Sequence, residues 1–308
     1  MAVRRHAVVV THPRLRESGT VVSDAVERLR NAGFEVSVND GIAAREYGAS
    51  TQVVPEDTEI VVVLGGDGTI LGAAELVHCT RVPILGINMG HVGFLAEFER
   101  FQMDEAIRRV AARDYSIDER MIAHVDVWLP GADRPIEDWA LNDITLERAD
   151  RGKMVELSIR VDDVEMSSFG ADGVIVSTPT GSTAYAFSAG GPIIWPNVKA
   201  LQLVPLAAHA LFARPLVIGA DSAFTLDILD DSTSDGWICC DGRRQRALPK
   251  GTRVEVRASR DTLRLARLSG APFTSRLVSK FDLPVVGWRE QARGDDARHH
   301  GRRLPAEG

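Results

Sequence analysis

The sequence predicts an α/β part followed by a mostly β part, and two patterns define that fold class. In the amino-terminal part, apolar runs rich in Val and Ile alternate with segments of helical periodicity, as in the βαβ units of a parallel sheet. Further along, several runs alternate between apolar and polar residues with period two, which is typical of half-exposed antiparallel strands. A chain of 308 residues, 44% of them hydrophobic, is long enough for two domains, each with its own core.

The α/β part shows a separate signal for each of its elements. Apolar residues at helical spacing predict the first helix, and Asn31-Ala32-Gly33 ends it. The run Glu59–Leu64 is almost continuously apolar, as expected of a strand buried on both faces of a parallel sheet. The polar stretch 39–58 is expected to be a mobile connection. In chain order, the expected elements are strand 7–10, helix 21–29, strand 34–38, strand 59–64, helix 69–77, strand 82–87 and helix 104–112.

The mostly β part is expected to begin near residues 115–119, and its clearest alternating runs are 123–129, 155–161 and 253–257. A last helix at 274–281 is expected to pack back on the first domain. The tail has almost no apolar residues, so it is expected to be disordered. The expected divisions are an α/β domain at 1–117, a β domain at 118–272, a returning segment at 273–290 and a tail at 291–308.

The most informative motif, Gly65-Gly66-Asp67-Gly68-Thr69, lies between an expected strand and an expected helix. Glycines without Cβ atoms let a phosphate approach the backbone, and the helix that follows directs free N–H groups and its positive dipole end toward an anion. The Asp67 carboxylate would repel that anion, so its presence indicates a hydroxyl or a bridging metal as its partner. A tight turn in which Asp67 caps the helix is the structural alternative.

A second motif, residues 170–185, repeats the order of acidic turn, apolar strand, polar loop and helix start. From Ser177 to Thr183 it carries five Ser/Thr hydroxyls in seven residues. These hydroxyls can hydrogen-bond a base edge, a ribose or a phosphate without adding charge, although a helix-capping loop would have the same composition. Two such motifs in one chain favour a nucleotide site.

Composition argues against several other classes. The net charge of −7 argues against a general nucleic-acid binder. No apolar run approaches the ~20 residues needed to cross a bilayer, and the run at 7–10 is too short for a signal peptide. The cysteines at positions 79, 239 and 240 have no metal-ligand spacing, and a reducing compartment fits them best. A soluble cytoplasmic protein without membrane contact is expected.

Five segments together resemble the NAD kinase family: GGDGT at 65–69, NMGHVGFL at 88–95, LND at 141–143, STPTGSTAY at 177–185 and SAGGP at 188–192. They occur in the order and spacing of that family, and the similarity extends from about Val61 to Trp288, which is most of the chain. The chain looks like a bacterial, actinobacterial-type member. Two departures are mild, because Ile70 stays apolar and Asp143, where the family more often has Glu, stays acidic. The resemblance implies a Rossmann-like first domain, a β-sandwich second domain and a homodimer or homotetramer.

The reaction that the resemblance implies is transfer of the terminal phosphoryl group of ATP to the 2′-hydroxyl of the adenosine ribose of NAD, giving NADP. In some relatives the donor is inorganic polyphosphate. Such a transfer needs an aligned hydroxyl, donors on the equatorial oxygens and a divalent cation such as Mg²⁺ to offset charge. Asp67 is expected either to accept the hydroxyl proton or to hold the hydroxyl in line, and magnesium coordination is a second role that the sequence leaves open.

The resemblance also implies a set of binding residues, and no residue is assigned to a metal. The phosphates of ATP are expected at Gly65, Gly66, Gly68 and Thr69. Asp172 is expected on the nicotinamide side, either within one subunit or reaching into a neighbouring one. Phe94 and Leu95 also fit plain core positions, and Asp241 also fits an ordinary hairpin turn. NAD is expected to contact Asp67, Gly68, Phe94, Leu95, Asn142, Asp143, Asp172, Thr183, Ala184, Tyr185, Ser188 and Asp241.

Other functions compete with this interpretation. A lipid kinase of the diacylglycerol or sphingosine type also carries GGDGT, but there the loop usually continues with Asn-Glu, whereas Ile70 and Leu71 follow here. A 6-phosphofructokinase shares a glycine-Asp turn but would not need STPTGSTAY. A non-catalytic NAD(P) sensor would keep the same pocket without turnover, and the retained Asp67 argues against it.

Overall fold

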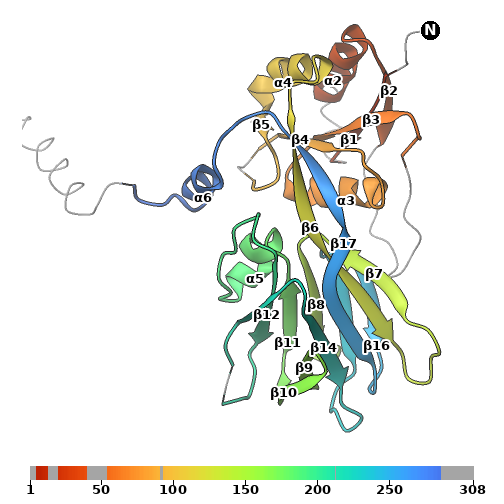
Figure 1. Ribbon diagram of the computed structural model, residues 1–308, viewed down its shortest axis with the longest axis vertical. Helices are drawn as coiled ribbons and strands as arrows, with labels where there is room; N and C mark the ends of the chain where they lie inside the picture. The colour runs from red at the N-terminus through yellow and green to blue at the C-terminus, as the bar shows by residue number, and fades with distance from the viewer. Residues whose placement is uncertain (1–4, 13–19, 40–53, 91–92, 212, 286–308) are drawn as a thin grey trace, which may run out of the picture.

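The computed structural model describes residues 5–12, 20–39, 54–90, 93–211 and 213–285. The α/β part lies at one end of the molecule and the β part at the other (Figure 1). Two long strands, β6 (Ser116–Trp128) and β17 (Arg253–Arg267), run from one part into the other. The predicted fold class, an α/β part plus a mostly β part, is therefore confirmed.

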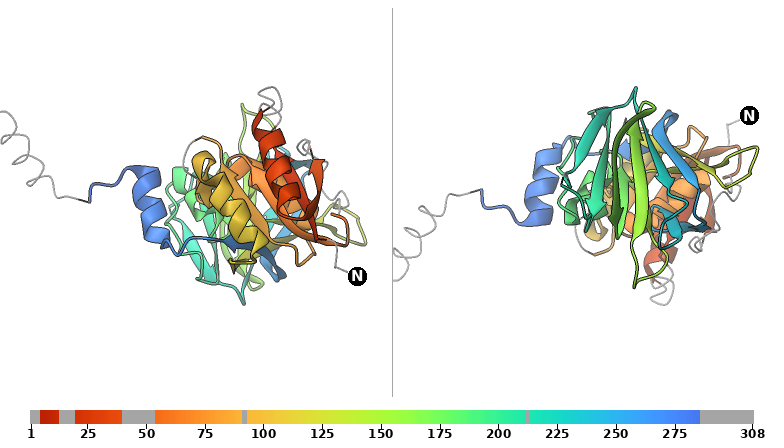
Figure 2. Two further views of the ribbon diagram at one scale, coloured as in Figure 1. Left: turned by 90° about the horizontal axis from the view of Figure 1, so that it is seen from above. Right: turned by 90° about the horizontal axis from the view of Figure 1, so that it is seen from below.

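The α/β part is built on four parallel strands in the order β4-β3-β1-β2. Helices α2 and α4 lie side by side on one face, as Figure 2 shows from above, and α3 packs on the other. Both faces are thus covered, which explains the unbroken apolar run in β3: Val61 and Val63 face α3, and Ile60 and Val62 face α2 and α4. The bounds are β1 Arg5–Thr11, α2 Thr20–Asn31, β2 Phe34–Asn39, β3 Thr58–Leu64, α3 Asp67–Val77, β4 Ile84–Asn88, β5 Phe98–Glu99, a 3₁₀ turn at Arg100–Gln102 and α4 Met103–Ala111.

This strand order reverses direction between β1 and β3. The chain leaves β1 toward β2 on one side and returns through β3 toward β4 on the other. Ligands of open α/β sheets bind at the carboxyl edge of such a switch point, because the two crossovers leave a crevice there. The loop after β3, which carries GGDGT, starts at this edge.

The β part is a sandwich of two sheets. An 11-stranded sheet, which continues from the parallel strands through β17, faces a 6-stranded sheet in the order β13-β12-β11-β8-β15-β16. Apolar residues such as Leu226 and Val254 from the first sheet meet Ile144 and Val176 from the second in one core. The bounds are β7 Ile136–Ala140, β8 Asp143–Arg148, β9 Val155–Val161, β10 Val164–Ala171, β11 Gly173–Ser177, β12 Ala200–Leu206, β13 Leu216–Gly219, β14 Ala223–Ile228, β15 Gly236–Cys240 and β16 Arg244–Leu248.

The strand expected at 253–257 is much longer in the structure. Residues 253–258 of β17 pair with β6 inside the sandwich, and after a register shift residues 262–267 pair with the first half of β6. Leu265 then pairs with Ile84, so β17 also lies beside the parallel strand β4. The position expected for the domain boundary, between residues 117 and 118, lies inside β6, so a strand crosses it.

The last described helix, α6 (Phe273–Phe281), returns to the first part of the chain. Arg276 donates hydrogen bonds to the carbonyl groups of Phe94 and Ala96, the latter at 2.6 Å, and the Phe273 and Phe281 rings lie 5.9 and 5.7 Å from the Phe94 ring. None of the helices in the described ranges is long and apolar enough to span a membrane. The expected tail at 291–308 and most of the stretch 39–58 lie outside the described residues.

Candidate functional site

The GGDGT loop joins β3 to α3, and the helix begins at Asp67, two residues earlier than the sequence predicts. Gly66 is the N-cap, and no side chain caps the helix, so the interpretation of Asp67 as a helix cap is wrong. Instead, the half-buried Asp67 carboxylate accepts hydrogen bonds from the backbone N–H groups of Phe94 (2.9 Å) and Leu95 (3.1 Å). The motif at 65–69 and the motif at 88–95 therefore meet at this carboxylate.

The glycines of the loop differ in what surrounds them. The N–H of Gly65 donates to the carbonyl of Ile87 (3.0 Å), and a Cβ on Gly65 would lie 2.4 Å from Oγ1 of Thr69. The N–H of Thr69 donates to the carbonyl of Gly66 (3.0 Å). By contrast, a Cβ on Gly66 or on Gly68 would meet nothing within 4 Å. The open backbone that a phosphate can approach is thus at Gly66 and Gly68.

The peptide of Asn142 is held from both sides in the turn between β7 and β8. The two carboxylate oxygens of Asp241 accept hydrogen bonds from the N–H groups of Leu141 (2.9 Å) and Asn142 (2.7 Å). On the other side, the N–H of Thr178 donates to the carbonyl of Asn142 (2.9 Å), and a Cβ on Gly181 would lie only 2.0 Å from that oxygen. The backbone of Asn142 is therefore fixed at both its N–H and its carbonyl group.

Asp241 itself is sealed from solvent, with a side-chain exposure of 0%. Asp241 and Gly242 both have positive φ angles, 53° and 66°, and they form the hairpin turn between β15 and β16. The backbone of Asp241 thus forms the ordinary hairpin turn that was the alternative interpretation. Its carboxylate in addition orients the turn that carries Asn142.

The polar loop after β11 uses most of its hydroxyls internally. Thr178 donates to the carbonyl of Leu141 (2.5 Å), and Ser182 donates to that of Pro179 (2.7 Å) and accepts from the N–H of Ile194 (2.8 Å). Ser177, Thr178 and Ser182 are fully buried. Three of the five hydroxyls, those of Ser177, Thr178 and Ser182, therefore hydrogen-bond within the loop and to its neighbours, where they replace missing backbone hydrogen bonds in a buried irregular segment.

The remaining predicted residues follow that loop. Thr183 and Ala184 are half-buried, and Tyr185 and Ser188 are exposed on the short helix α5 (Tyr185–Ser188), which follows a 3₁₀ turn at Gly181–Thr183. Burial and then the negative charges of Glu147, Asp143 and Asp172 raise the pKa of Tyr185. Asp172 is also paired with Arg148 at 3.1 Å.

Asp143 lies beside Asp241 in the buried turn. Burial, and then the charge of Asp241, raise the pKa of Asp143 from 3.8 to about 7. The folded protein therefore keeps a proton on Asp143 at pH values where the unfolded chain has lost it. The sign of the linkage follows: between about pH 4 and pH 7, stability falls as pH rises, because ionisation is favourable only in the unfolded state.

We expect Asp143→Asn to remove that part of the pH dependence. The variant should gain free energy of unfolding relative to wild type as pH rises from 5 to 8, because the amide carries no charge to bury. Urea unfolding at several pH values measures the difference, and Asp133→Asn, at an exposed position, is the matched control. A constant difference between pH 5 and 8 would contradict the raised pKa.

Phe94 and Leu95 are both buried, and their side chains point to different neighbours. The Phe94 ring packs against α6, whereas Leu95 belongs to the core beneath α3. Their backbone N–H groups are the part of these two residues that contacts Asp67.

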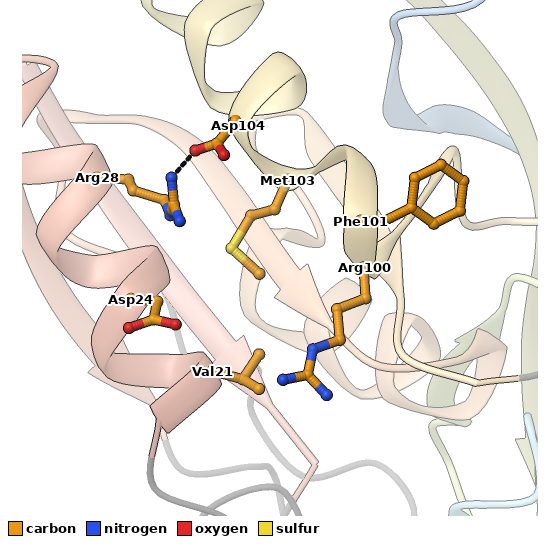
Figure 3. A pocket seen from close by; sticks show the side chains of 7 residues that line it. All are labelled: Val21, Asp24, Arg28, Arg100, Phe101, Met103 and Asp104. Carbon is orange, nitrogen blue, oxygen red and sulfur yellow. Dashed lines mark ion pairs between the residues drawn. The ribbon is translucent and has the colours of Figure 1, made fainter.

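A cavity of about 480 Å³ lies elsewhere, between α2 and α4 (Figure 3). An ion pair between Arg28 and Asp104 crosses it, and Arg100 extends its guanidinium toward Val21. None of the predicted site residues lines it.

Sequence reasoning missed a group of charged side chains that connects two parts of the candidate site. Arg120 contacts Oγ1 of Thr180 (3.4 Å) and pairs with Asp118, which also pairs with Arg267. Arg267 in turn donates to the carbonyl of Leu95 (3.0 Å), so this chain of contacts joins the loop after β11 to the peptide beside Asp67. The partners of these charged residues lie far away in the sequence, so the pairs could not be recognised from it. Glu75, a charged residue among apolar ones in the second half of the helix at 67–77, was the one sign of a buried ion pair in the motif region.

An anchored carboxylate beside open glycines, at the switch point of a doubly wound sheet, is typical of α/β proteins that bind phosphate groups. The amino-terminal ATP-NAD kinase domain model matches residues 8–115, and the carboxyl-terminal one matches residues 141–268. An NAD kinase of Bifidobacterium longum subsp. infantis is 79% identical over 98% of this chain and 90% of its own. One of Leifsonia xyli is 49% identical over 97% of this chain and all of its own. The chain belongs to the NAD kinase family.

Solved structures agree with this assignment. A crystal structure of an Archaeoglobus fulgidus NAD kinase in complex with ATP has a TM-score of 0.69 at 25% identity, over 90% of this chain and 98% of its own. Yeast NADH kinase complexed with NADH has the same fold, with a TM-score of 0.80 over 93% of this chain and 90% of its own, at 22% identity.

Proposed function

We propose that this protein transfers the terminal phosphoryl group of ATP to the 2′-hydroxyl of the adenosine ribose of NAD and so forms NADP. The anchored carboxylate of Asp67 is the observation that carries the proposal. It lies at the first position of α3, next to the open backbone of Gly66 and Gly68, where the helix dipole favours an anion. The acceptor hydroxyl and the donor phosphate would thus meet at the start of α3.

Asp67 is proposed to act on the acceptor hydroxyl. Each carboxylate oxygen accepts one backbone N–H and keeps lone-pair capacity for a hydroxyl. Because two separate N–H groups fix the carboxylate plane, the side chain is oriented before the substrate arrives. Such preorganisation serves an in-line transfer, whose rate depends on alignment more than on covalent help from the protein.

The NAD contacts are proposed at the residues that border this point and the Asn142 turn. The core beneath α3 contains both Ile70 and Leu141, so the GGDGT helix and the Asn142 turn are packed as neighbours. Around the turn lie Asp143 and Tyr185, while Asp241 positions the peptide. The full proposed set is Asp67, Gly68, Phe94, Leu95, Asn142, Asp143, Asp172, Thr183, Ala184, Tyr185, Ser188 and Asp241, with ATP phosphates at Gly65, Gly66, Gly68 and Thr69.

A divalent cation such as Mg²⁺ is proposed to enter with the nucleotide. The described residues contain no group of three or more His, Cys, Asp or Glu side chains that could hold a metal on their own. Mg²⁺ keeps several waters and is commonly bound by one or two carboxylates plus substrate phosphates, so the Asp67 carboxylate fits it. The cation would offset charge on the transferred phosphoryl group.

We expect NADP to form when the protein is mixed with NAD, ATP and MgCl₂, and we expect EDTA to abolish the reaction and excess MgCl₂ to restore it. An NADP-specific dehydrogenase detects the product. A parallel arm replaces ATP with inorganic polyphosphate and identifies the donor. Absence of NADP above a blank without enzyme would refute the kinase activity and favour an NAD(P) sensor.

Assembly and location are also proposals. A homodimer or homotetramer is supported by exposed apolar side chains on the 6-stranded sheet, among them Val217 and Trp237, which a second subunit could cover. Light scattering of the purified protein tests this. A cytoplasmic location, in keeping with NADP synthesis, is supported by three free cysteines, at positions 79, 239 and 240.

A further inference from the structure

One buried cluster of charges joins the helix that starts at Asp67 to the turn that carries Asn142. We call it the Arg244 cluster, and its members come from α3, β7 and the hairpin between β15 and β16. Its central side chain, that of Arg244, is only 4% exposed. The members are Glu75, Asp138, Asp241, Arg243 and Arg244.

The guanidinium of Arg244 contacts three elements at once, namely α3, β7 and the hairpin turn that carries Asp241. Nη1 donates to Glu75 (2.8 Å) on α3, and Nε donates to Asp138 (2.8 Å) on β7. Nη2 donates to the carbonyl of Trp139 (2.5 Å) and contacts Asp241 at 3.4 Å. A planar fork with fixed donor directions can satisfy these partners together, whereas the single ammonium group of lysine cannot.

A second contact reinforces the same junction. The guanidinium carbon of Arg244 lies 4.5 Å from the centre of the Trp139 ring, and the His78 ring stacks on Trp139 with centroids 4.2 Å apart. His78 is the C-cap of α3, so both ends of this stack belong to the elements that the cluster joins. Burial, then the charge of Arg244, lower the pKa of His78 to about 4, so the ring is neutral at physiological pH.

The cluster leads directly to the site. Arg244 contacts Asp241, and Asp241 accepts the N–H groups of Leu141 and Asn142. Glu75 lies two helical turns after Asp67 on α3, so a shift of this helix moves both residues. The distance between Asp67 and Asn142 therefore depends on the contacts that Arg244 makes to Glu75 and Asp241.

We propose that Arg244 is a positioning residue for NAD, because it fixes the Asn142–Asp143 turn relative to the helix that carries Asp67. This inference rests on the proposed site, in which NAD contacts both elements. ATP phosphates, at Gly66 and Gly68, need only one of them. The cluster thus governs NAD binding more than ATP binding.

The test is Arg244→Lys, measured by steady-state kinetics at a temperature where circular dichroism shows the variant folded. We expect the KM for NAD to rise roughly ten-fold or more, because a small misplacement of groups that bind a substrate has effects of this size. The KM for ATP should stay near its wild-type value. Glu75→Gln keeps the size of the side chain and removes its charge, and we expect the same change to a smaller extent. This second variant decides the question if Arg244→Lys does not fold.

Arg160→Lys is the matched control, because Arg160 pairs with Asp227 at 2.6 Å between β9 and β14, outside the proposed site. We expect it to leave the KM for NAD unchanged. An unchanged KM for NAD in Arg244→Lys, or an equal rise in Arg160→Lys, would overturn the proposal. If the wild type forms no NADP, the kinase activity fails instead, and calorimetric titration with NAD alone then compares the affinities of wild type and Arg244→Lys in the same way.

Discussion

Replacing Asp67 by Asn is expected to lower turnover of NAD by roughly 10²–10⁴, the usual contribution of a positioned base, while NAD still binds. The amide keeps one oxygen that can accept a backbone N–H from Phe94 or Leu95, so the loop stays in place. It cannot accept a proton from the ribose hydroxyl. Turnover is measured through NADP formation, and NAD binding through titration calorimetry.

The matched control for that experiment is Asp133→Asn, an identical change at an exposed position between β6 and β7. It is expected to leave turnover unchanged. If Asp67→Asn instead loses NAD affinity and keeps the turnover of bound substrate, Asp67 serves to hold the loop or a metal and is not the base.

Gly181→Ala is expected to have the second large effect. A Cβ at this position would lie 2.0 Å from the carbonyl oxygen of Asn142 and 2.4 Å from its carbon, and neither is a flexible side-chain end that can move away. The loop after β11 and the Asn142 turn must separate, and overpacking of this kind costs about 3 kcal/mol of the free energy of unfolding. Because Asn142 moves, the KM for NAD should rise as well.

Thermal unfolding and steady-state kinetics measure both consequences of this change. Gly219→Ala is the control, because a Cβ there meets nothing within 4 Å. It should leave the melting temperature and the KM for NAD near their wild-type values. A Gly181→Ala variant as stable and as active as Gly219→Ala would show that the loop after β11 can move without loss.

Much of the fold was predictable because its elements carry local signals. The apolar run of β3, the helical spacing of α2 and the period of two in β9 appear directly in the residues. The full length of β17 was not predictable, because a register shift between Ala258 and Thr262 interrupts its period of two, and because Arg264 and Arg267 beyond it depend on partners in another strand. These arginines pair with Glu119 and Asp118 of β6, and such partners become visible only when distant strands meet.

The sequence indicated which residues form the candidate site, but it did not show what each of them contacts. The motif at 65–69 indicated a carboxylate among glycines, and the structure adds the N–H groups of Phe94 and Leu95 that hold it. For the polar loop after β11, composition alone could not separate ligand contacts from internal ones. Burial makes that distinction, and it assigns Ser177, Thr178 and Ser182 to the loop itself.

The passage of β6 and β17 through both parts of the molecule limits how the enzyme can move. Rotation of one half against the other would have to bend or twist this paired ribbon, so the pairing of the two strands opposes a free hinge between the two parts. A fragment that ends at residue 115 would also lose the partner of Ile84 in β17 and expose a sheet edge that invites aggregation.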